Sequence, residues 1–327
     1  MSNKKTSIYV LAGIALCLLI AFIMIPLNSS EAAGNKKTAA WTKPDNFDAL
    51  STVPAGEPQT QLMEGGRKVQ TESRFNVPTF LWASDPGPAR SMRQDAVGKK
   101  DDAVAAARSH IGSYADRYRL SRKDIAAARV EMVHNTGTGA IIVKFQQDLG
   151  GVPVFRDELN VVMNRDLQLI SLSGYLTGDH AVDTSSASNF RLQPEDALAA
   201  ALADLSGRSV DTSALQRTEA PKGDALSKTD DQYTRFTSDR KALPGFFFSE
   251  EPSRTKAVMF HMPDGYTPAY YVETAINVPT MNTNVLHASG EAMPEEWAYG
   301  YVISAIDGKV LFRMNQVAEQ ATYRVWA

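Results

Sequence analysis

The sequence predicts an α+β fold of two successive units, each with one helix packed on a curled antiparallel sheet. In residues 145–175, FQQDLGGVPVFRDELNVVMNRDLQLISLSGY, apolar and polar side chains alternate along strands separated by two turns. Such alternation is typical of antiparallel strands with one buried and one solvated face. A helical pattern precedes this stretch, and a second helical pattern precedes four more strand patterns. The same order of elements therefore occurs twice.

Composition and charge are those of a globular protein. The chain has 327 residues, of which 43% are hydrophobic, so it is long enough for two domains with a substantial core. The net charge of −3 comes with no basic block, and nothing in the sequence predicts a nucleic-acid partner. The only cysteine, Cys17, lies near the N-terminus, which leaves the rest of the chain without thiol chemistry or a disulfide.

Residues 1–32 have the pattern of an export signal. Lys4 and Lys5 precede an apolar run over 8–27, and a polar stretch with small residues suited to a signal peptidase follows. The run is also about as long as a membrane-spanning helix. A cleaved signal peptide and a retained membrane anchor both stay open. Either predicts a secreted, periplasmic or extracellular protein whose only membrane contact is the segment 8–27.

Residues 33–100 have little periodicity and many Gly, Pro, Gln, Ser and Lys residues, which predicts an extended N-terminal arm. Within it, SRFNVPTFLWAS (73–84) concentrates apolar side chains, including Phe80, Leu81 and Trp82. This stretch predicts either a strand packed on its own domain or an apolar hook that docks on a partner.

The first unit begins with a helix predicted over 101–121, which has an acidic start and one apolar face. The residues of that face are Val104, Ala107, Ile111, Tyr114 and Tyr118. Strands are predicted at 128–135, 140–149, 152–163 and 169–175, separated by turns that contain Gly or an Asn-Arg-Asp sequence. One helix on a four-stranded meander is the expected arrangement.

The second unit begins with a helix predicted over 191–207, with Pro194 in its first turn and Gly207 at its end. A long polar stretch, 208–254, is interpreted as a surface excursion. The strand patterns that follow lie at 255–262, 267–278, 296–306 and 309–315.

No pattern predicts catalytic, cofactor-binding or metal-binding residues. The five histidines, at 110, 134, 180, 261 and 287, are scattered, and none forms the His-Glu-x-x-His spacing of a zinc helix. Asp157 and Glu158 are neighbours on a strand and point to opposite faces, so they do not form an acid/base pair. Both carboxylates are therefore predicted to be solvated.

Several of these motifs resemble the propeptides of zinc metallopeptidases. The stretch 145–176, with its Gly-x-Pro-Val-Phe turn and closing Ser-x-Gly, resembles the propeptide domain shared by fungalysin-type and thermolysin-type enzymes. LQPEDALAAAL, AYYVETAIN and YGYVISAIDGKVLFRMNQV resemble the PepSY-like unit of the same propeptides. VPTFLWA and the terminal ATYRVWA resemble segments of the fungalysin family, and this favours that branch.

The resemblance implies a division of the chain. Residues 101–180 would be a fungalysin/thermolysin-type propeptide domain, 190–318 a PepSY-like domain, and 319–327 the start of a missing catalytic region. Both domains would be similar to the cystatin fold. The family's zinc ligands have no counterpart in this sequence, so zinc is expected only in the missing catalytic domain.

The function implied by the resemblance is that of an inhibitory and folding-assisting propeptide, non-catalytic as it stands. Its partner would be a zinc metallopeptidase catalytic domain, acting in cis or in trans. The candidate docking residues are Phe80, Leu81, Trp82, Tyr323, Val325 and Trp326.

Two other interpretations stay open. In the first, the chain is the N-terminal fragment of a complete secreted fungalysin-family metallopeptidase. In the second, it is a free-standing exported protease inhibitor or binding module. It ends on the apolar, strand-like TYRVWA with no polar tail, which favours truncation over a finished inhibitor.

Overall fold

The computed structural model describes residues 43–55, 63–64, 67–83, 100–178, 189–219, 232–238, 247–248, 253–278 and 295–317. All of these residues belong to one compact unit, Thr42–Ala327. The predicted export helix and the terminal segment 319–327 lie outside the described residues. None of the described helices has the length and apolar character needed to cross a membrane. The fold is mixed α/β, mostly an open curled sheet with few helices.

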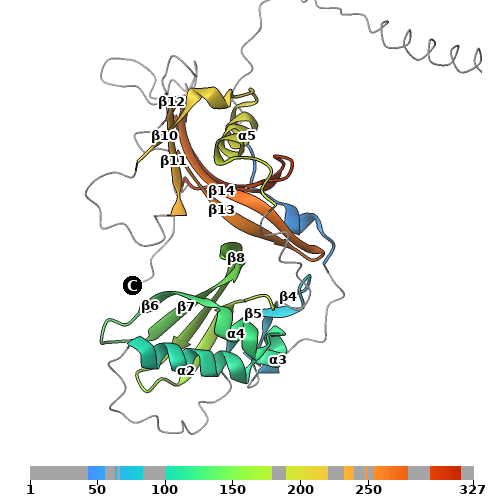
Figure 1. Cartoon of the computed structure of the whole chain (residues 1–327). Helices are drawn as coiled ribbons and strands as arrows, with labels where there is room; N and C mark the ends of the chain where they lie inside the picture. The colour runs from blue at the N-terminus through green and yellow to red at the C-terminus, as the bar shows by residue number, and fades with distance from the viewer. Residues whose placement is uncertain are drawn as a thin grey trace, which may run out of the picture. The chain divides into compact units, whose positions relative to one another are not determined.

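The first predicted sheet is present with nearly the predicted boundaries (Figure 1). It consists of β6 (Arg129–His134), β7 (Ile141–Leu149), β8 (Val152–Met163) and β9 (Leu169–Gly174), paired antiparallel in chain order. Helix α2 (Lys100–Ser113) lies across one face. Its residues Ala103, Ala107 and Ile111 are buried against strand residues such as Phe145 and Leu159. The alternation read from the sequence therefore gives the buried face that it predicts.

The prediction of one continuous helix over 101–121 is wrong, because the chain forms three helices in this region. After α2 come α3 (Ala115–Tyr118) and α4 (Arg122–Ala127). Arg119 ends α3 in the left-handed conformation, with φ 56°, which a right-handed helix cannot continue. Ser121 then starts α4 through a capping box, in which Ser121 and Asp124 exchange side-chain and backbone hydrogen bonds.

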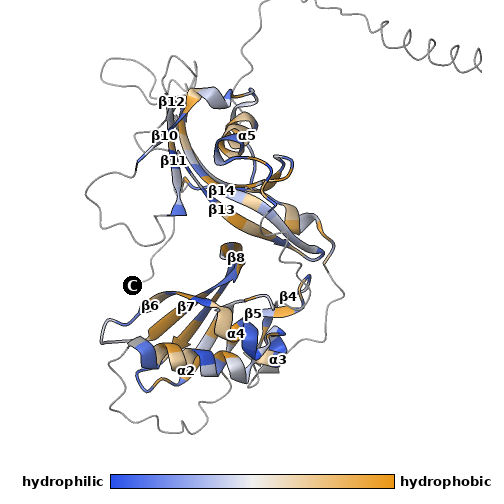
Figure 2. Cartoon of the chain, in the orientation of Figure 1, coloured by the Kyte–Doolittle hydropathy of each residue, from blue (hydrophilic) through white to orange (hydrophobic). Residues whose placement is uncertain are grey.

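The second helix and its strands also follow the predicted order. Helix α5 (Pro194–Ser206) has Pro194 at its start and ends at Gly207, with φ 66°. It covers one face of the antiparallel ladder formed by β13 (Ser253–Met262), β14 (Gly265–Val278) and β15 (Glu295–Ser304), to which β16 (Val310–Asn315) adds. Hydrophobic colouring along α5 and β7 marks the elements that form the two cores (Figure 2).

Parts of the predicted polar excursion, 208–254, belong to the sheet. A 3-10 helix, η4 (Thr212–Ala214), leads into β10 (Leu215–Thr218). That strand pairs with β11 (Thr234–Ser238), which in turn pairs with β13, and β12 (Phe247–Phe248) pairs with β14. Strands β10 and β11 are short and rich in polar residues, so their sequence lacks the alternation of a half-buried strand.

The described parts of the predicted arm are likewise paired. Strand β1 (Phe47–Asp48) pairs with β16 and leads into the 3-10 helix η1 (Ala49–Thr52). Strands β4 (Gln70–Glu72) and β5 (Val77–Trp82) form a hairpin that pairs with β9, and β2 (Met63–Glu64) pairs with β3 (Arg67–Lys68). The segment 73–84 therefore contains a strand of the first sheet, which was one of its two predicted roles.

Strand β8 joins the two sheets into one. Its Val154 pairs in parallel with Met259 of β13, and its residues from Leu159 onward pair with β9. Strand β7 pairs with β8 at both of these regions, from Val152 and from Glu158 onward. Phe155 packs against Phe260, Tyr271 and Phe312 of the second sheet. The described strands thus form a continuous 14-stranded sheet, with a separate two-stranded sheet of β2 and β3.

Gly174 is required at the end of β9, so we predict that Gly174→Ala strongly destabilises the fold. Its φ is +85°, and an added Cβ would lie 2.0 Å from the backbone oxygen of Glu158. Positive φ and overpacking each cost about 1–3 kcal/mol, so a loss of at least about 3 kcal/mol in the free energy of unfolding is expected.

Gly137→Ala is the matched control, because Gly137 has φ +86° and no atom within 4 Å of the added Cβ. Gly137→Ala should lower the free energy of unfolding by only about 1–2 kcal/mol, which is the cost of placing a side chain at positive φ. Urea unfolding followed by circular dichroism measures both losses, and equal losses would contradict the predicted clash.

Candidate functional site

The predicted docking residues of β5 point to both faces of the first sheet. Leu81 is fully buried in the core under α2, so it is corrected from a docking residue to a packing residue. Its neighbours Phe80 and Trp82 lie on the opposite face because side chains alternate along a strand. Their rings meet edge to face, 5.2 Å apart, and Trp82 is 41% exposed. Tyr323, Val325 and Trp326 lie outside the described residues.

The sheet register places further apolar side chains beside these two rings. Trp82 pairs with Ser171, which pairs with Val162, and Val162 pairs with Ile142. In a neighbouring row, Lys144 of β7 pairs with Met132 of β6, which is 46% exposed. We call this surface the outer face; its apolar members are Phe80, Trp82, Met132, Ile142 and Val162.

A second site, which the sequence did not predict, lies where β8 meets β13. Asp157 is only 1% exposed, so the prediction that it is solvated is wrong. Arg156, with φ +65°, interrupts the regular strand, and from Asp157 onward the odd-numbered residues point inward. Glu158 is partly exposed and forms a 2.8 Å ion pair with Lys144.

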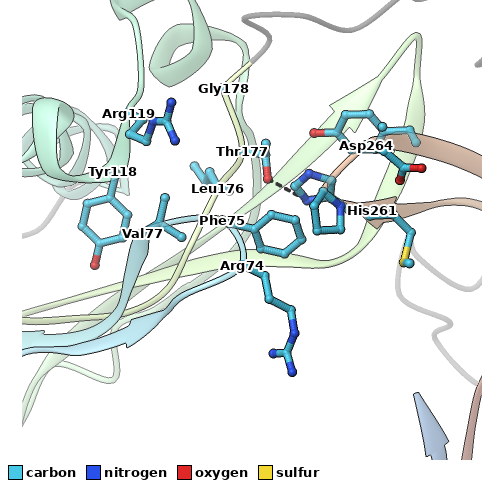
Figure 3. Close-up of a pocket in the computed structure, with 14 residues that line it drawn as sticks. Arg74, Phe75, Val77, Tyr118, Arg119, Leu176, Thr177, Gly178, His261 and Asp264 are labelled. Atoms are coloured by element: carbon cyan, nitrogen blue, oxygen red, sulfur yellow. Dashed lines mark hydrogen bonds between the residues drawn. The ribbon is translucent and has the colours of Figure 1, made fainter. Parts of the chain in front are cut away.

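Asp157, Thr177 and His261 form a hydrogen-bonded cluster. Figure 3 shows the contact between Thr177 and His261. The Thr177 hydroxyl donates to Asp157 Oδ2 and lies 3.1 Å from His261 Nδ1. The same imidazole nitrogen is 3.3 Å from Asp157 Oδ2. The imidazole stacks between Phe75, at 4.0 Å, and Tyr266, at 4.5 Å, with nearly parallel planes. Its position is therefore fixed by residues from both sheets.

This cluster has the wrong geometry for a nucleophilic relay. In a Ser-His-Asp triad the nucleophile and the acid contact different nitrogens of the imidazole. Here the Thr177 hydroxyl and Asp157 both lie at Nδ1 of His261. Within the described residues, no group of three His, Cys, Asp or Glu side chains is placed to hold a metal ion. The cluster links Asp157 of β8 and Thr177, which follows β9, to His261 of β13.

One signal in the sequence could have revealed Asp157. The residues Leu159, Val161 and Met163 form the buried face of β8, and Asp157 has the same phase. A period of two therefore places the carboxylate inside. No comparable signal identifies His261 as its partner, because the two residues are brought together only by the joining of the sheets.

Comparisons with known proteins support one part of the resemblance. The model of the fungalysin/thermolysin propeptide motif matches residues 126–176, which run from the end of α4 to just beyond β9. This motif indicates a peptidase propeptide of the thermolysin or fungalysin type, hence association with a peptidase catalytic domain and an extracellular location. A search of curated proteins finds no match.

Among solved structures, the C-terminal domain of YpeB from Bacillus megaterium is similar at 10% sequence identity. The alignment covers 73% of this chain and 71% of that chain, with a TM-score of 0.22. A score this low carries no conclusion about function.

We predict that His261→Ala destabilises the protein by about 2–4 kcal/mol, because it removes two stacking contacts and a polar partner of a buried carboxylate. His134→Ala is the control, since His134 lies exposed on β6, and it should change the free energy of unfolding by less than about 0.5 kcal/mol. Urea unfolding of both variants measures the difference. Equal free energies of unfolding for the two variants would show that the cluster does not hold the sheets together.

Proposed function

We propose that this chain is the inhibitory and folding-assisting propeptide of a secreted zinc metallopeptidase of the fungalysin branch, and is not itself a catalyst. The observation that carries the proposal is the match of the propeptide motif to β6–β9, which pair antiparallel in chain order beneath α2. The zinc would belong to the catalytic domain. Residues 190–318 would be the PepSY-like unit, and residues 1–32 the export signal or anchor.

The outer face is the proposed docking surface for the catalytic domain. Interfaces draw most of their binding energy from a few aromatic or large apolar side chains surrounded by polar groups. Trp82 and Phe80 are such anchors, and Ser173 and Lys144 lie in the same row of the sheet as Phe80. The terminal residues Tyr323, Val325 and Trp326 are proposed as a second contact.

Covalent attachment explains how a modest surface could inhibit a protease. A tethered inhibitor meets its target at an effective concentration of roughly millimolar, so weak contacts keep the complex closed. Cleavage of the tether removes this advantage and releases the enzyme. The sheet surface would also offer the folding catalytic domain a template. Backbone pairing sets the register of β7, β8 and β9 before the catalytic domain docks.

We predict that the full chain hydrolyses no casein in the presence of zinc but slows casein hydrolysis by a separately supplied fungalysin-type catalytic domain. Trp82→Ala should raise the inhibition constant about 10- to 100-fold, the range of an aromatic anchor. Met314→Ala is the matched control, because Met314 is similarly exposed at 39% but lies on β16.

Three results would contradict these expectations. Zinc-dependent hydrolysis by the chain alone would overturn its non-catalytic role. Failure to inhibit any fungalysin-type or thermolysin-type catalytic domain would overturn the inhibitory role. Equal effects of the substitutions at Trp82 and Met314 would remove the outer face as the docking surface.

A further inference from the structure

A pocket of about 310 Å³ lies between the β13–β14 turn, the β4–β5 turn and the chain just after β9 (Figure 3). Its volume is at the low end of small-molecule sites, which suits one aromatic side chain or a small aromatic molecule. Much of the wall is apolar or aromatic, and it includes Phe75, Val77, Leu176, Met262 and Tyr266. The pocket therefore favours a ligand with an apolar body.

His261 is a buried polar residue of this wall. Its side chain is only 9% exposed and is held between the nearly parallel rings of Phe75 and Tyr266, which also line the pocket. Its Nδ1 contacts Thr177 and Asp157. Its Nε2 has no hydrogen-bond partner among the described residues and, unlike Asp157 Oδ1, is not shielded from solvent. A ligand can therefore reach this nitrogen.

The position of Asp157 indicates which way Nε2 of His261 points. His261 also lines a neighbouring pocket beside Arg156 of β8, and Asp157 lines that pocket but not the one in Figure 3. Asp157 lies at Nδ1 of the imidazole. Because the two ring nitrogens point in divergent directions, Nε2 faces away from Asp157 and toward the pocket in Figure 3.

The hydrogen bonds of Thr177 place a proton on Nδ1 of His261. A hydroxyl has one hydrogen, and Thr177 donates it to Asp157 Oδ2. At its 3.1 Å contact with His261, Thr177 must therefore accept, so Nδ1 is the donor. A neutral imidazole with its proton on Nδ1 has a lone pair on Nε2. The pocket thus contains an accessible acceptor that requires an N–H or O–H group.

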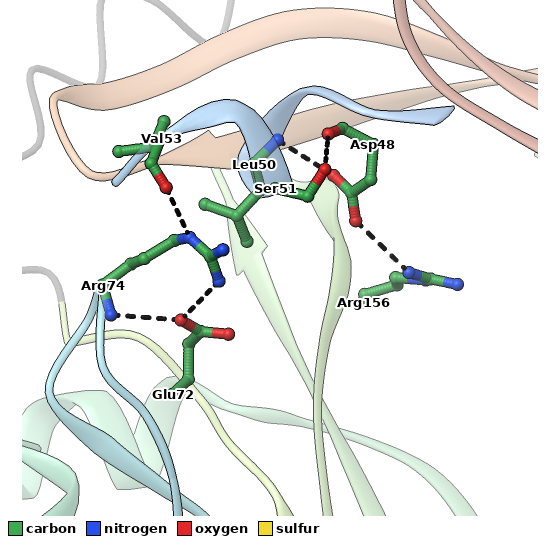
Figure 4. A network of polar contacts seen from close by, with 7 residues as sticks. All are labelled: Asp48, Leu50, Ser51, Val53, Glu72, Arg74 and Arg156. Atoms are coloured by element: carbon green, nitrogen blue, oxygen red, sulfur yellow. Dashed lines mark hydrogen bonds and ion pairs between the residues drawn. The ribbon is translucent and has the colours of Figure 1, made fainter. Parts of the chain in front are cut away.

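The charges around the pocket favour a neutral ligand. Arg74 lines the pocket, but its Nε donates to the Val53 carbonyl and its Nη1 to Glu72, each at 3.0 Å (Figure 4). Arg119 and Asp264 also line the pocket; both are exposed, and their charges are opposite in sign. These four charges balance, so neither an anion nor a cation is preferred.

A phenol combines the groups that the pocket requires. Its O–H is a donor for Nε2 of His261. Its ring supplies apolar surface and can pack edge to face or offset against Phe75 and Tyr266, as aromatic pairs prefer. An aliphatic alcohol of similar length would bury less apolar surface, and an aromatic ring without a donor would leave the buried acceptor without a partner.

We propose that this pocket binds a neutral phenol, carried either by a Tyr side chain of a bound polypeptide or by a free aromatic molecule, with its hydroxyl donating to Nε2 of His261. The proposal is independent of the role in inhibiting a peptidase, because it concerns the isolated chain.

Isothermal titration of the full chain with p-cresol tests the proposal, at about pH 8, where histidine side chains are ordinarily neutral. The matched probe is 4-methylanisole, which has nearly the same shape without the O–H donor. Saturable binding of p-cresol is expected, with at least about 10-fold weaker binding of 4-methylanisole, the effect of one buried hydrogen bond. N-acetyl-tyrosine amide and the peptide Ala-Ala-Tyr-Ala-Ala distinguish a side chain from a free phenol.

His261→Phe keeps a ring between Phe75 and Tyr266 but removes the acceptor, so it should weaken binding of p-cresol at least about 10-fold. His134→Phe is the control, because His134 lies exposed on β6 and does not line the pocket. Should circular dichroism show that His261→Phe unfolds the chain, His261→Asn replaces it with the same expectation, since its amide retains a donor for Thr177.

Three outcomes would overturn the proposal. The first is no saturable binding of p-cresol or the tyrosine probes at about 10 mM, well above the micromolar-to-millimolar range of weak sites, which would show a pocket filled by water only. The second is equal binding of p-cresol and 4-methylanisole. The third is equal binding of p-cresol by the His261 variant and the His134 control.

Discussion

The structure depends on β8 exchanging one of its partners part-way along its length. Val154 pairs with Met259 of β13, and the residues from Leu159 onward pair with β9, whereas β7 pairs with both the first and the later residues of β8. The left-handed Arg156 lies between these two regions and sets which side chains face inward after it. Asp157 is therefore buried at the junction, where a carboxylate is tolerated only with hydrogen-bond donors. Thr177 and His261 supply contacts from opposite sides of the junction.

The same strand determines which surface the first sheet presents. Because α2 packs on the side of Leu159 and Val161, the intervening residues Asn160 and Val162 belong to the outer face. Backbone pairing on both edges of β8 holds these side chains in register with Phe80 and Trp82. A surface fixed in this way would lose little conformational entropy if a partner docked on it, so more of the contact energy would appear as affinity.

Regular elements were predictable because their signals are local. Strand β8 begins and ends at the predicted residues, and Pro194 and Gly207 mark the start and end of α5. Strands β4, β10 and β11 were missed because they are short and their sequences, QTE, LQRT and TRFTS, lack the pattern of a half-buried strand. The His261 contact was missed for a different reason, since Thr177 and His261 are separated by 84 positions and meet only in the folded chain.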